Sequence, residues 1–148
     1  MKSWRHPVFA ALSILLFVGL LAGYELLQEV RTTAVHSCVA SIGRQIQNNP
    51  GGLLSELDPQ WRTLSKEKTK ELVLTLQNQR SLDCGRVLEE ANGVYTDLWG
   101  NPIRISVRRK DGDLEVLVWT AGPDGQPRTR DDTTTVWREP VPPNVPIE

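Results

Sequence analysis

The N-terminal part of the chain contains a long apolar run that limits where the rest of the protein can fold. The run VFAALSILLFVGLLAGY, Val8–Tyr24, carries no charge. As a helix rising about 1.5 Å per residue it covers roughly 25 Å, close to the lower limit for crossing a bilayer. Lys2 and Arg5 precede the run and Glu25 follows it, so the positive-inside rule leaves the N-terminus in the cytoplasm and exports the remainder. Residues 1–24 are therefore predicted to be a cytoplasmic flank and a single-pass membrane anchor.

A cleaved secretory signal is the alternative interpretation, because it also combines a basic start with an apolar core. The exit of the run, LLAGYELL, has no clean pair of small residues for a cleavage site. Helix-forming residues also continue beyond it without a break. These two features favour an uncleaved anchor over a signal that is removed.

The next segment, residues 25–49, has the periodicity of an amphipathic helix. Apolar residues recur every three or four positions, at Leu27, Val30, Ala34, Cys38, Ile42 and Ile46. No proline interrupts the chain between Val8 and Asn49, so the anchor and this segment are predicted to form one helix that ends at Asn49-Pro50-Gly51-Gly52. We expect the first half of the apolar stripe to face neighbouring subunits near the membrane. The second half should cover the exported domain of its own chain.

Two cysteines lie on the exported side of the predicted anchor. Cys38 is on the apolar stripe, and Cys84 is too far from it in sequence for a CxxC metal or redox motif. An even number of cysteines in an oxidising compartment permits a disulfide, which would fasten the helix to the domain. The alternative is that both are small buried apolar residues.

Residues 50–138 are predicted to form a small exported α+β domain. Ser65–Gln79 has a helical pattern, with Ser65 as its N-cap and Leu72, Val73 and Leu76 facing inward. From Leu98 the period becomes that of strands, over 102–110 and 113–120, with Asp111-Gly112 as a hairpin turn and a third strand over Thr133–Trp137. The proline-rich residues 139–148 are expected to be an extended tail without a core.

The loop between the last two predicted strands, AGPDGQPRTRDD, is rich in aspartate. Asp124, Asp131 and Asp132 could supply three carboxylates to a hard cation, and main-chain carbonyls and water would complete the six to eight oxygens that calcium takes. Gly122 and Gly125 would allow the chain to turn its carbonyls inward. No cysteine or histidine is nearby, which disfavours zinc and copper, and magnesium demands stricter geometry than such a loop offers.

The same loop could also be an ordinary surface loop. Arg128 and Arg130 would then neutralise the aspartates as exposed ion pairs, each contributing only about 0–1 kcal/mol. Composition alone leaves the metal site and the solvated loop both open.

Two ordered motifs resemble the C-terminal domain of the major pseudopilin of type II secretion. They are Asp97-Leu98-Trp99-Gly100-Asn101-Pro102, followed after a hairpin by Ala121-Gly122-Pro123-Asp124-Gly125 and Thr129-Arg130-Asp131-Asp132. The resemblance covers roughly Tyr95 to Thr134. It implies a calcium loop beside a small antiparallel sheet and a pilin-like long helix. The carboxylate ligands it implies are Asp124, Asp131 and Asp132, with a main-chain carbonyl near Ala121 as a weaker ligand, and it gives Asp97, Trp99, Gly100 and Pro102 a structural role.

The N-terminus departs from that family. Pilin-like precursors carry a Gly-Phe-Thr-Leu-x-Glu type of junction, whereas Arg5–Leu12 contains no such glycine and no glutamate, and Glu25 lies at the far end of the run. Two hypotheses follow for a protein of the bacterial inner membrane with a periplasmic domain. One is a pseudopilin-like structural or assembly protein that contacts other pseudopilin subunits or secretion-system proteins. The other is a stand-alone anchored accessory domain that binds another envelope protein and forms no filament.

The sequence gives little support to an enzyme or to a nucleic-acid-binding protein. His6 lies on the cytoplasmic flank, while His36 and Cys38 are two positions apart and point to different sides of a helix. No Ser-His-Asp set, phosphate-binding glycine loop or zinc pattern is present. The formal net charge of −1 lacks the clustered positive charge that nucleic acid requires. We therefore predict a non-catalytic protein without a small-molecule substrate, with the membrane as one partner and Ca²⁺ as its only cofactor.

Overall fold

A computed structural model of the chain describes residues 5–50, 58–78, 82, 84, 87–135 and 141–147, with side chains from Leu12 onward. The chain forms two compact units, Met1–Arg31 and Thr32–Glu148. Helix α1, Arg5–Asn48, supplies the first unit and continues into the second. It ends just before Pro50, where the sequence predicts the stop.

The first unit consists of the apolar part of α1. Its large apolar side chains are exposed from Leu12 to Val30, and Leu27 and Val30 of the predicted stripe are among them. Within the described residues, Leu12–Asn48 is one helix that is long and apolar enough to cross a membrane by length and composition. A secretory signal sequence near an N-terminus can have the same length and apolar composition. The exposed apolar surface is therefore compatible with both interpretations of the run.

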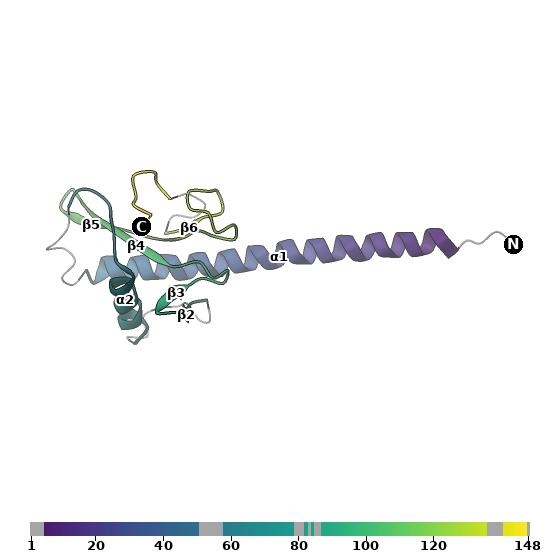
Figure 1. Cartoon of the computed structure of the whole chain (residues 1–148), viewed down its shortest axis with the longest axis horizontal. Helices are drawn as coiled ribbons and strands as arrows, with labels where there is room; N and C mark the ends of the chain where they lie inside the picture. The colour runs from purple at the N-terminus through teal and green to yellow at the C-terminus, as the bar shows by residue number, and fades with distance from the viewer. Residues whose placement is uncertain are drawn as a thin grey trace. The chain divides into compact units, whose positions relative to one another are not determined.

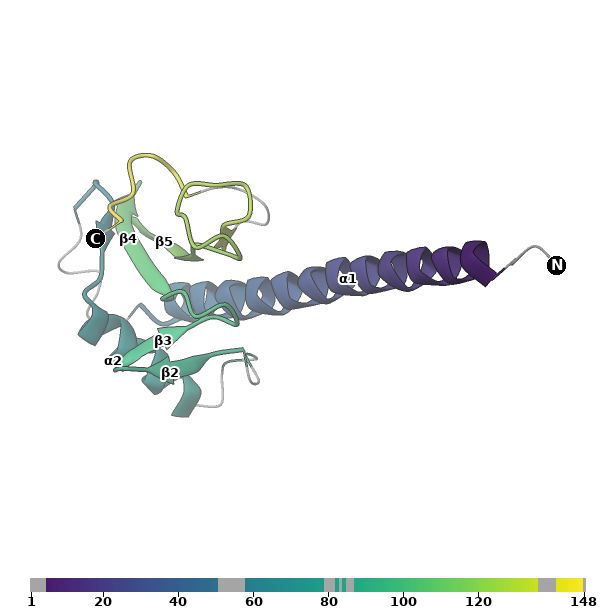
Figure 2. The same cartoon turned by 45° about the vertical axis from the view of Figure 1, so that its right-hand side comes forward.

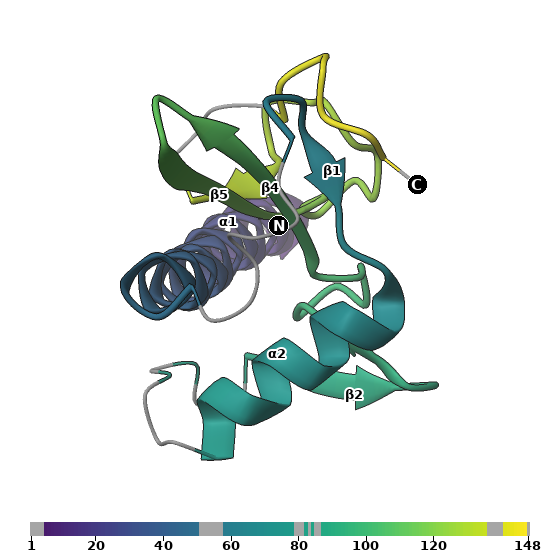
Figure 3. The same ribbon diagram turned by 90° about the vertical axis from the view of Figure 1, so that its left-hand side faces the viewer.

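The second unit contains a four-stranded antiparallel sheet. Its strands are β1 (Arg62–Thr63), β4 (Arg104–Lys110), β5 (Asp113–Thr120) and β6 (Thr133–Thr134), in the order β1-β4-β5-β6 (Figure 3). The predicted turn between β4 and β5 is present, with positive φ at Asp111 and Gly112, as a tight two-residue hairpin of this type requires. Of the predicted third strand, residues 136 and 137 lie outside the described part of the chain.

The C-terminal half of α1 packs on one face of this sheet (Figure 1). Its fully buried apolar residues are Val35, Cys38, Val39, Ile42 and Ile46. They meet the inward residues of the two central strands, Ile105, Val107, Val116 and Val118. The prediction that this half of the helix covers its own domain is confirmed, and Val35 and Val39 widen the expected stripe.

Helix α2 (Lys66–Asn78) lies beside a second, two-stranded sheet made of β2 (Glu89–Ala91) and β3 (Val94–Thr96) (Figure 2). Ser65 Oγ accepts the Lys68 N–H at 3.3 Å, as expected of an N-cap. Val73 and Leu76 are buried as predicted, together with Thr69. The β2–β3 hairpin was not predicted, although Asn92-Gly93, both at positive φ, is a strong turn signal.

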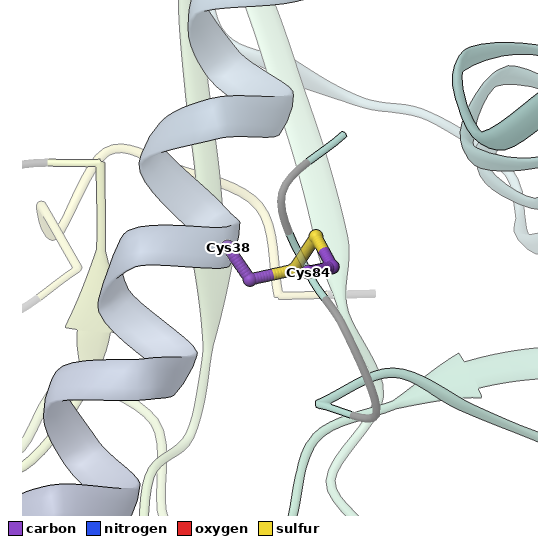
Figure 4. Close-up of a disulfide and its surroundings, with 2 residues drawn as sticks. All are labelled: Cys38 and Cys84. Atoms are coloured by element: carbon purple, nitrogen blue, oxygen red, sulfur yellow. A yellow bond between two sulfur atoms is a disulfide. The ribbon is translucent and has the colours of Figure 1, made fainter. Parts of the chain in front are cut away.

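Among the described residues, a disulfide, a hydrogen bond and a close packing contact fasten α1 to the rest of the second unit. Cys38 and Cys84 form a disulfide that joins the helix to the segment between α2 and β2 (Figure 4). His36 Nδ1 lies 3.0 Å from the Thr134 carbonyl oxygen, which gives this histidine a structural contact with β6. Gly43 approaches Thr135 so closely that an added Cβ would lie 2.6 Å from the Thr135 methyl group. The helix is therefore fixed against the edge strand as well as against the sheet face.

The expectation of a tail without a core is wrong for residues 141–147, which we call the strap. Val141 and Val145 are buried and form a second apolar cluster with Leu117 and Trp119 of β5. The strap lies on the side of the sheet away from α1 (Figures 1 and 2). Prolines prevent regular structure in this segment, but they do not prevent its two valines from completing the core.

Candidate metal-binding loop

The aspartate loop, residues 121–132, leaves β5 and returns to β6 through a close contact between its two ends. Gly122 has a positive φ, and a Cβ added there would lie only 2.0 Å from the Asp131 carbonyl oxygen. Only glycine permits this approach. The backbone therefore brings the start of the loop against Asp131. Ala121, directly after β5, is buried.

Asp124 and Asp131 face each other across the loop. The Asp124 N–H donates to Asp131 Oδ2 at 2.9 Å, and Thr129 Oγ1 donates to Asp131 Oδ1 at 2.5 Å. Asp124 Oδ1 in turn accepts the Gln126 N–H at 2.7 Å. Burial raises the pKa of Asp131, but its hydrogen bonds from Thr129 and Asp124 outweigh this effect and hold the pKa below its usual range. The Asp131 carboxylate is thus held in its charged form.

Asp132 occupies a different environment from the other two aspartates. It is 3% exposed, and its Oδ2 accepts the N–H groups of Arg128, at 2.7 Å, and Val141, at 3.1 Å. Within the described residues its other oxygen, Oδ1, is buried without a hydrogen-bond partner, and so is Thr133 Oγ1. Burial raises the pKa of Asp132, although its backbone hydrogen bonds oppose the effect. A buried carboxylate oxygen without a partner is costly unless a proton or a cation satisfies it.

The structure brings two of the predicted ligands together and sets the third apart. Asp124 and Asp131 are in contact, whereas Asp132 is directed by its bonds to Arg128 and Val141. Across the described residues, no three His, Cys, Asp or Glu side chains are grouped closely enough to hold a metal ion. The chemistry of the loop suits a hard cation, because its donors are carboxylates, carbonyls and hydroxyls. A cation bound by all three aspartates would require their carboxylates to draw together.

The loop does not form the surface ion pairs of the alternative prediction, within the described part of the chain. Arg128 directs its guanidinium to the carbonyl oxygens of Pro143, at 2.8 Å, and Val145, at 3.0 Å. Where the structure describes the chain, neither Arg128 nor Arg130 forms an ion pair with an aspartate of the loop. The carboxylates are therefore not neutralised by the neighbouring guanidinium groups.

The predicted structural motif, Asp97–Pro102, forms a turn that supports the loop. Asp97 is buried, and its Oδ1 accepts the N–H groups of Trp99 and Asn101, both at 2.9 Å. Gly100 has a positive φ within this turn, and Pro102 bridges back to Thr96. Asn101 Nδ2 then donates to the Gly122 carbonyl oxygen at 2.5 Å. Sequence reasoning placed Asp97, Trp99, Gly100 and Pro102 in this motif but did not identify Asn101 as its link to the loop.

A cavity of about 550 Å³ lies elsewhere, between the β1–α2 junction and strands β3 and β4. Its apolar lining includes Leu64, Tyr95 and Ile103, and charged residues such as Arg62 and Lys66 stand at its edge. No buried side-chain polar atom without a partner lies among its described lining residues, in contrast to the loop. The aspartate loop, and not this cavity, therefore combines oxygen donors with a buried polar atom that has no partner within the described residues.

Comparison with known proteins adds no relative to these observations. No protein-family model, no curated protein and no solved structure matches the chain at a significant level.

Proposed function

We propose that the protein is a non-catalytic, membrane-anchored structural or assembly protein with a pseudopilin-like periplasmic domain that calcium stabilises. The long apolar helix packed on an antiparallel sheet supports a pilin-like architecture. The observation that carries the calcium site is the buried, unpartnered Oδ1 of Asp132 in a loop that also holds Asp124 and Asp131. The disulfide supports an exported domain, because disulfides persist in oxidising compartments.

The role of the ion in this proposal is to order the end of the fold. Asp124, Asp131 and Asp132 would hold it together with main-chain carbonyls, and Ala121 stands where the resemblance implies one of these. Without the ion the three negative charges repel one another and the loop is looser. Calcium binding would neutralise the charges and stabilise the return of the chain to β6, so that binding free energy contributes to folding. Partners would be other pseudopilin-like subunits or proteins of a type II secretion-type system.

The calcium site is tested by thermal unfolding of the full chain in detergent micelles, with calcium or with a chelator. Extracellular calcium modules often bind at about 10⁻⁴–10⁻³ M, so 10 mM calcium should add about 1–3 kcal/mol and raise the Tm by roughly 5–10 °C. Asp124→Asn keeps an oxygen to accept the Gln126 N–H but removes the charge. It should abolish the calcium-dependent rise and change the Tm little in chelator.

Asp113→Asn is the matched control, because Asp113 is an exposed aspartate at the start of β5, at the opposite end of that strand from the loop. This variant should keep the full response to calcium. Equal Tm values with calcium and with chelator for the unaltered chain would exclude the calcium site.

The N-terminal sequence favours a second candidate, an anchored accessory domain that binds another envelope protein and forms no filament. Arg5–Leu12 lacks the glycine and glutamate of pilin-like precursors. Mass measurement of the mature protein distinguishes the two candidates. Trimming near Val8 or Phe9 would support a processed pilin-like subunit, whereas an intact basic flank would support the accessory protein.

A further inference from the structure

The strap closes the face of the sheet that α1 leaves open. Val141 and Val145 are 2% and 1% exposed, and they pack on Leu117 and Trp119. The described strap residues form no helix or strand, so no backbone ladder holds them to the sheet. Its position therefore depends on the packing of the two valines and of the partly buried Ile147, and on individual hydrogen bonds.

Residues 141–145 of the strap are held by residues of the aspartate loop. The Val141 N–H donates to Asp132 Oδ2 at 3.1 Å, and Arg128 donates to the carbonyl oxygens of Pro143 and Val145. Asp132 Oδ2 also accepts the Arg128 N–H, so one carboxylate oxygen orients both the loop backbone and the strap. The conformation of the loop thus determines where the strap anchors lie.

The last residues of the strap are held by the sheet and not by the loop. Thr63 Oγ1 donates to the Pro146 carbonyl oxygen at 2.6 Å, and Arg104 donates to the Ile147 carbonyl oxygen. These bonds do not involve any loop aspartate. Loosening of the loop would therefore release residues 141–145, which include both valines. It would leave the far end with these two hydrogen bonds and the packing of Ile147 on the apolar cluster.

We infer that the strap is a cover whose seating on β5 is coupled to cation binding in the aspartate loop, with Arg128 as the positioning residue that links them. The inference rests on the proposed calcium loop. When the loop is loaded, Asp132 and Arg128 are fixed and the strap covers Leu117 and Trp119. When it is empty, repulsion among the aspartates loosens these anchors and the apolar face opens. The calcium concentration in the periplasm then controls whether this face is exposed to other exported proteins.

Thermodynamic linkage makes the coupling reciprocal. If calcium binding favours the strap packed on β5, a strap that cannot pack there must weaken calcium binding by the same factor. Val145→Asp places a charge where Val145 is buried, but it changes no residue of the loop. It should lower the calcium affinity by about tenfold or more. Leu74→Asp on α2 is the control, because it also replaces an apolar residue by aspartate but lies on an exposed surface, and it should leave the affinity unchanged.

Amide exchange tests the forward direction of the coupling. In the full chain in detergent micelles, the Val141 and Val145 N–H groups, which donate to Asp132 and to the Pro142 carbonyl, should exchange at least tenfold more slowly in calcium than in chelator. Arg128→Ala should remove this difference while calorimetry still detects calcium binding, with an affinity lowered by the same factor as the loss of strap protection. Arg130→Ala, which removes the same charge from the same loop, should behave like the unaltered chain.

The possible results separate this inference from the proposed function. Calcium binding by calorimetry with equal strap exchange in calcium and chelator would overturn the coupling and leave the calcium site intact. An unchanged calcium affinity in Val145→Asp would overturn it as well. Absence of calcium binding in the unaltered chain would overturn the proposed calcium site and the coupling together.

Discussion

At the scale of single residues, two motifs separated in sequence are held against each other by side-chain hydrogen bonds. Asp97 Oδ2 accepts the Thr120 hydroxyl at 2.6 Å, and Asn101 donates to the Gly122 carbonyl oxygen. Thr120 and Gly122 stand on either side of Ala121, where β5 passes into the aspartate loop. The Asp97–Pro102 turn therefore fixes the start of the loop, and Gly122 fixes its closure against Asp131.

We predict that Gly122→Ala strongly destabilises the exported domain. Its φ is positive, which costs a residue with a Cβ about 1–2 kcal/mol, and the added Cβ would meet the Asp131 carbonyl oxygen at 2.0 Å. The neighbour is backbone and can move only if the loop opens, so the total loss should exceed about 2 kcal/mol. Urea unfolding of the full chain in detergent measures it.

Gly112→Ala is the control that measures the cost of a positive φ without a steric clash such as that between a Cβ at position 122 and the Asp131 carbonyl oxygen. Gly112 also has a positive φ, but a Cβ added there meets nothing within 4 Å. Its loss should stay within the conformational cost of about 1–2 kcal/mol. Equal losses in the two variants would mean that the close approach of Gly122 to Asp131 does not constrain the loop.

At the scale of elements, β5 is the strand that contributes side chains to both apolar clusters of the domain. Val116 and Val118 face α1, whereas Leu117 and Trp119 face the strap, so the second half of the strand is buried on both sides. Trp119 Nε1 also donates to Ser106 Oγ on β4 at 3.3 Å. A strand buried on both faces needs a cover on each, which explains why a segment as rich in proline as the strap belongs to the fold.

The connection between α1 and the α2–β2 segment should depend on the disulfide. Cys38 and Cys84 are 46 positions apart, and the chain-entropy relation gives about 4 kcal/mol for a closed loop of this length. Replacing both cysteines by alanine should lower the free energy of unfolding by about this amount, since Cys38 is fully buried and alanine introduces no polar group. Urea unfolding with and without a reducing agent tests the prediction.

The reducing agent supplies the internal control for that experiment. It should lower the unfolding midpoint of the unaltered chain and leave the alanine variant unchanged. A midpoint that does not respond to reduction in the unaltered chain would show that the bridge contributes nothing to stability.

At the scale of the whole molecule, the N-terminal run is expected to anchor an exported domain. Leu16, near the middle of the run, is exposed, as are its apolar neighbours. Leu16→Arg places a charge at the centre of the span, where arginine costs about 2.5–3.5 kcal/mol on insertion scales. We expect this variant to be depleted from alkaline-washed membranes, whereas the unaltered chain should remain with them until detergent is added.

Leu27→Arg is the matched control for membrane insertion, because Leu27 is also an exposed leucine of α1 but lies beyond Tyr24. It should stay with the membranes as the unaltered chain does. Release of the unaltered chain by the alkaline wash would identify the run as a cleaved signal and not an anchor.

Much of the fold follows from local sequence patterns. The proline-free stretch up to Asn49 predicts α1, and its apolar spacing predicts the face that Cys38, Ile42 and Ile46 bury. Period-two alternation and Asp111-Gly112 predict the β4–β5 hairpin. These features were predictable because helix and strand periodicity and turn chemistry depend on neighbours along the chain.

The remaining features depend on contacts between distant residues. Val141 and Val145 are isolated apolar residues among prolines, and only the apolar face of β5 gives them a place in the core. The three aspartates are close in sequence, yet hydrogen bonds from Arg128 and Val141 turn Asp132 inward while Asp124 and Asp131 face each other. Sequence alone therefore determined the two helices, the β4–β5 hairpin and the acidic character of the loop. The tertiary structure decided which carboxylate is buried and which segment covers the sheet, because both depend on packing across the fold.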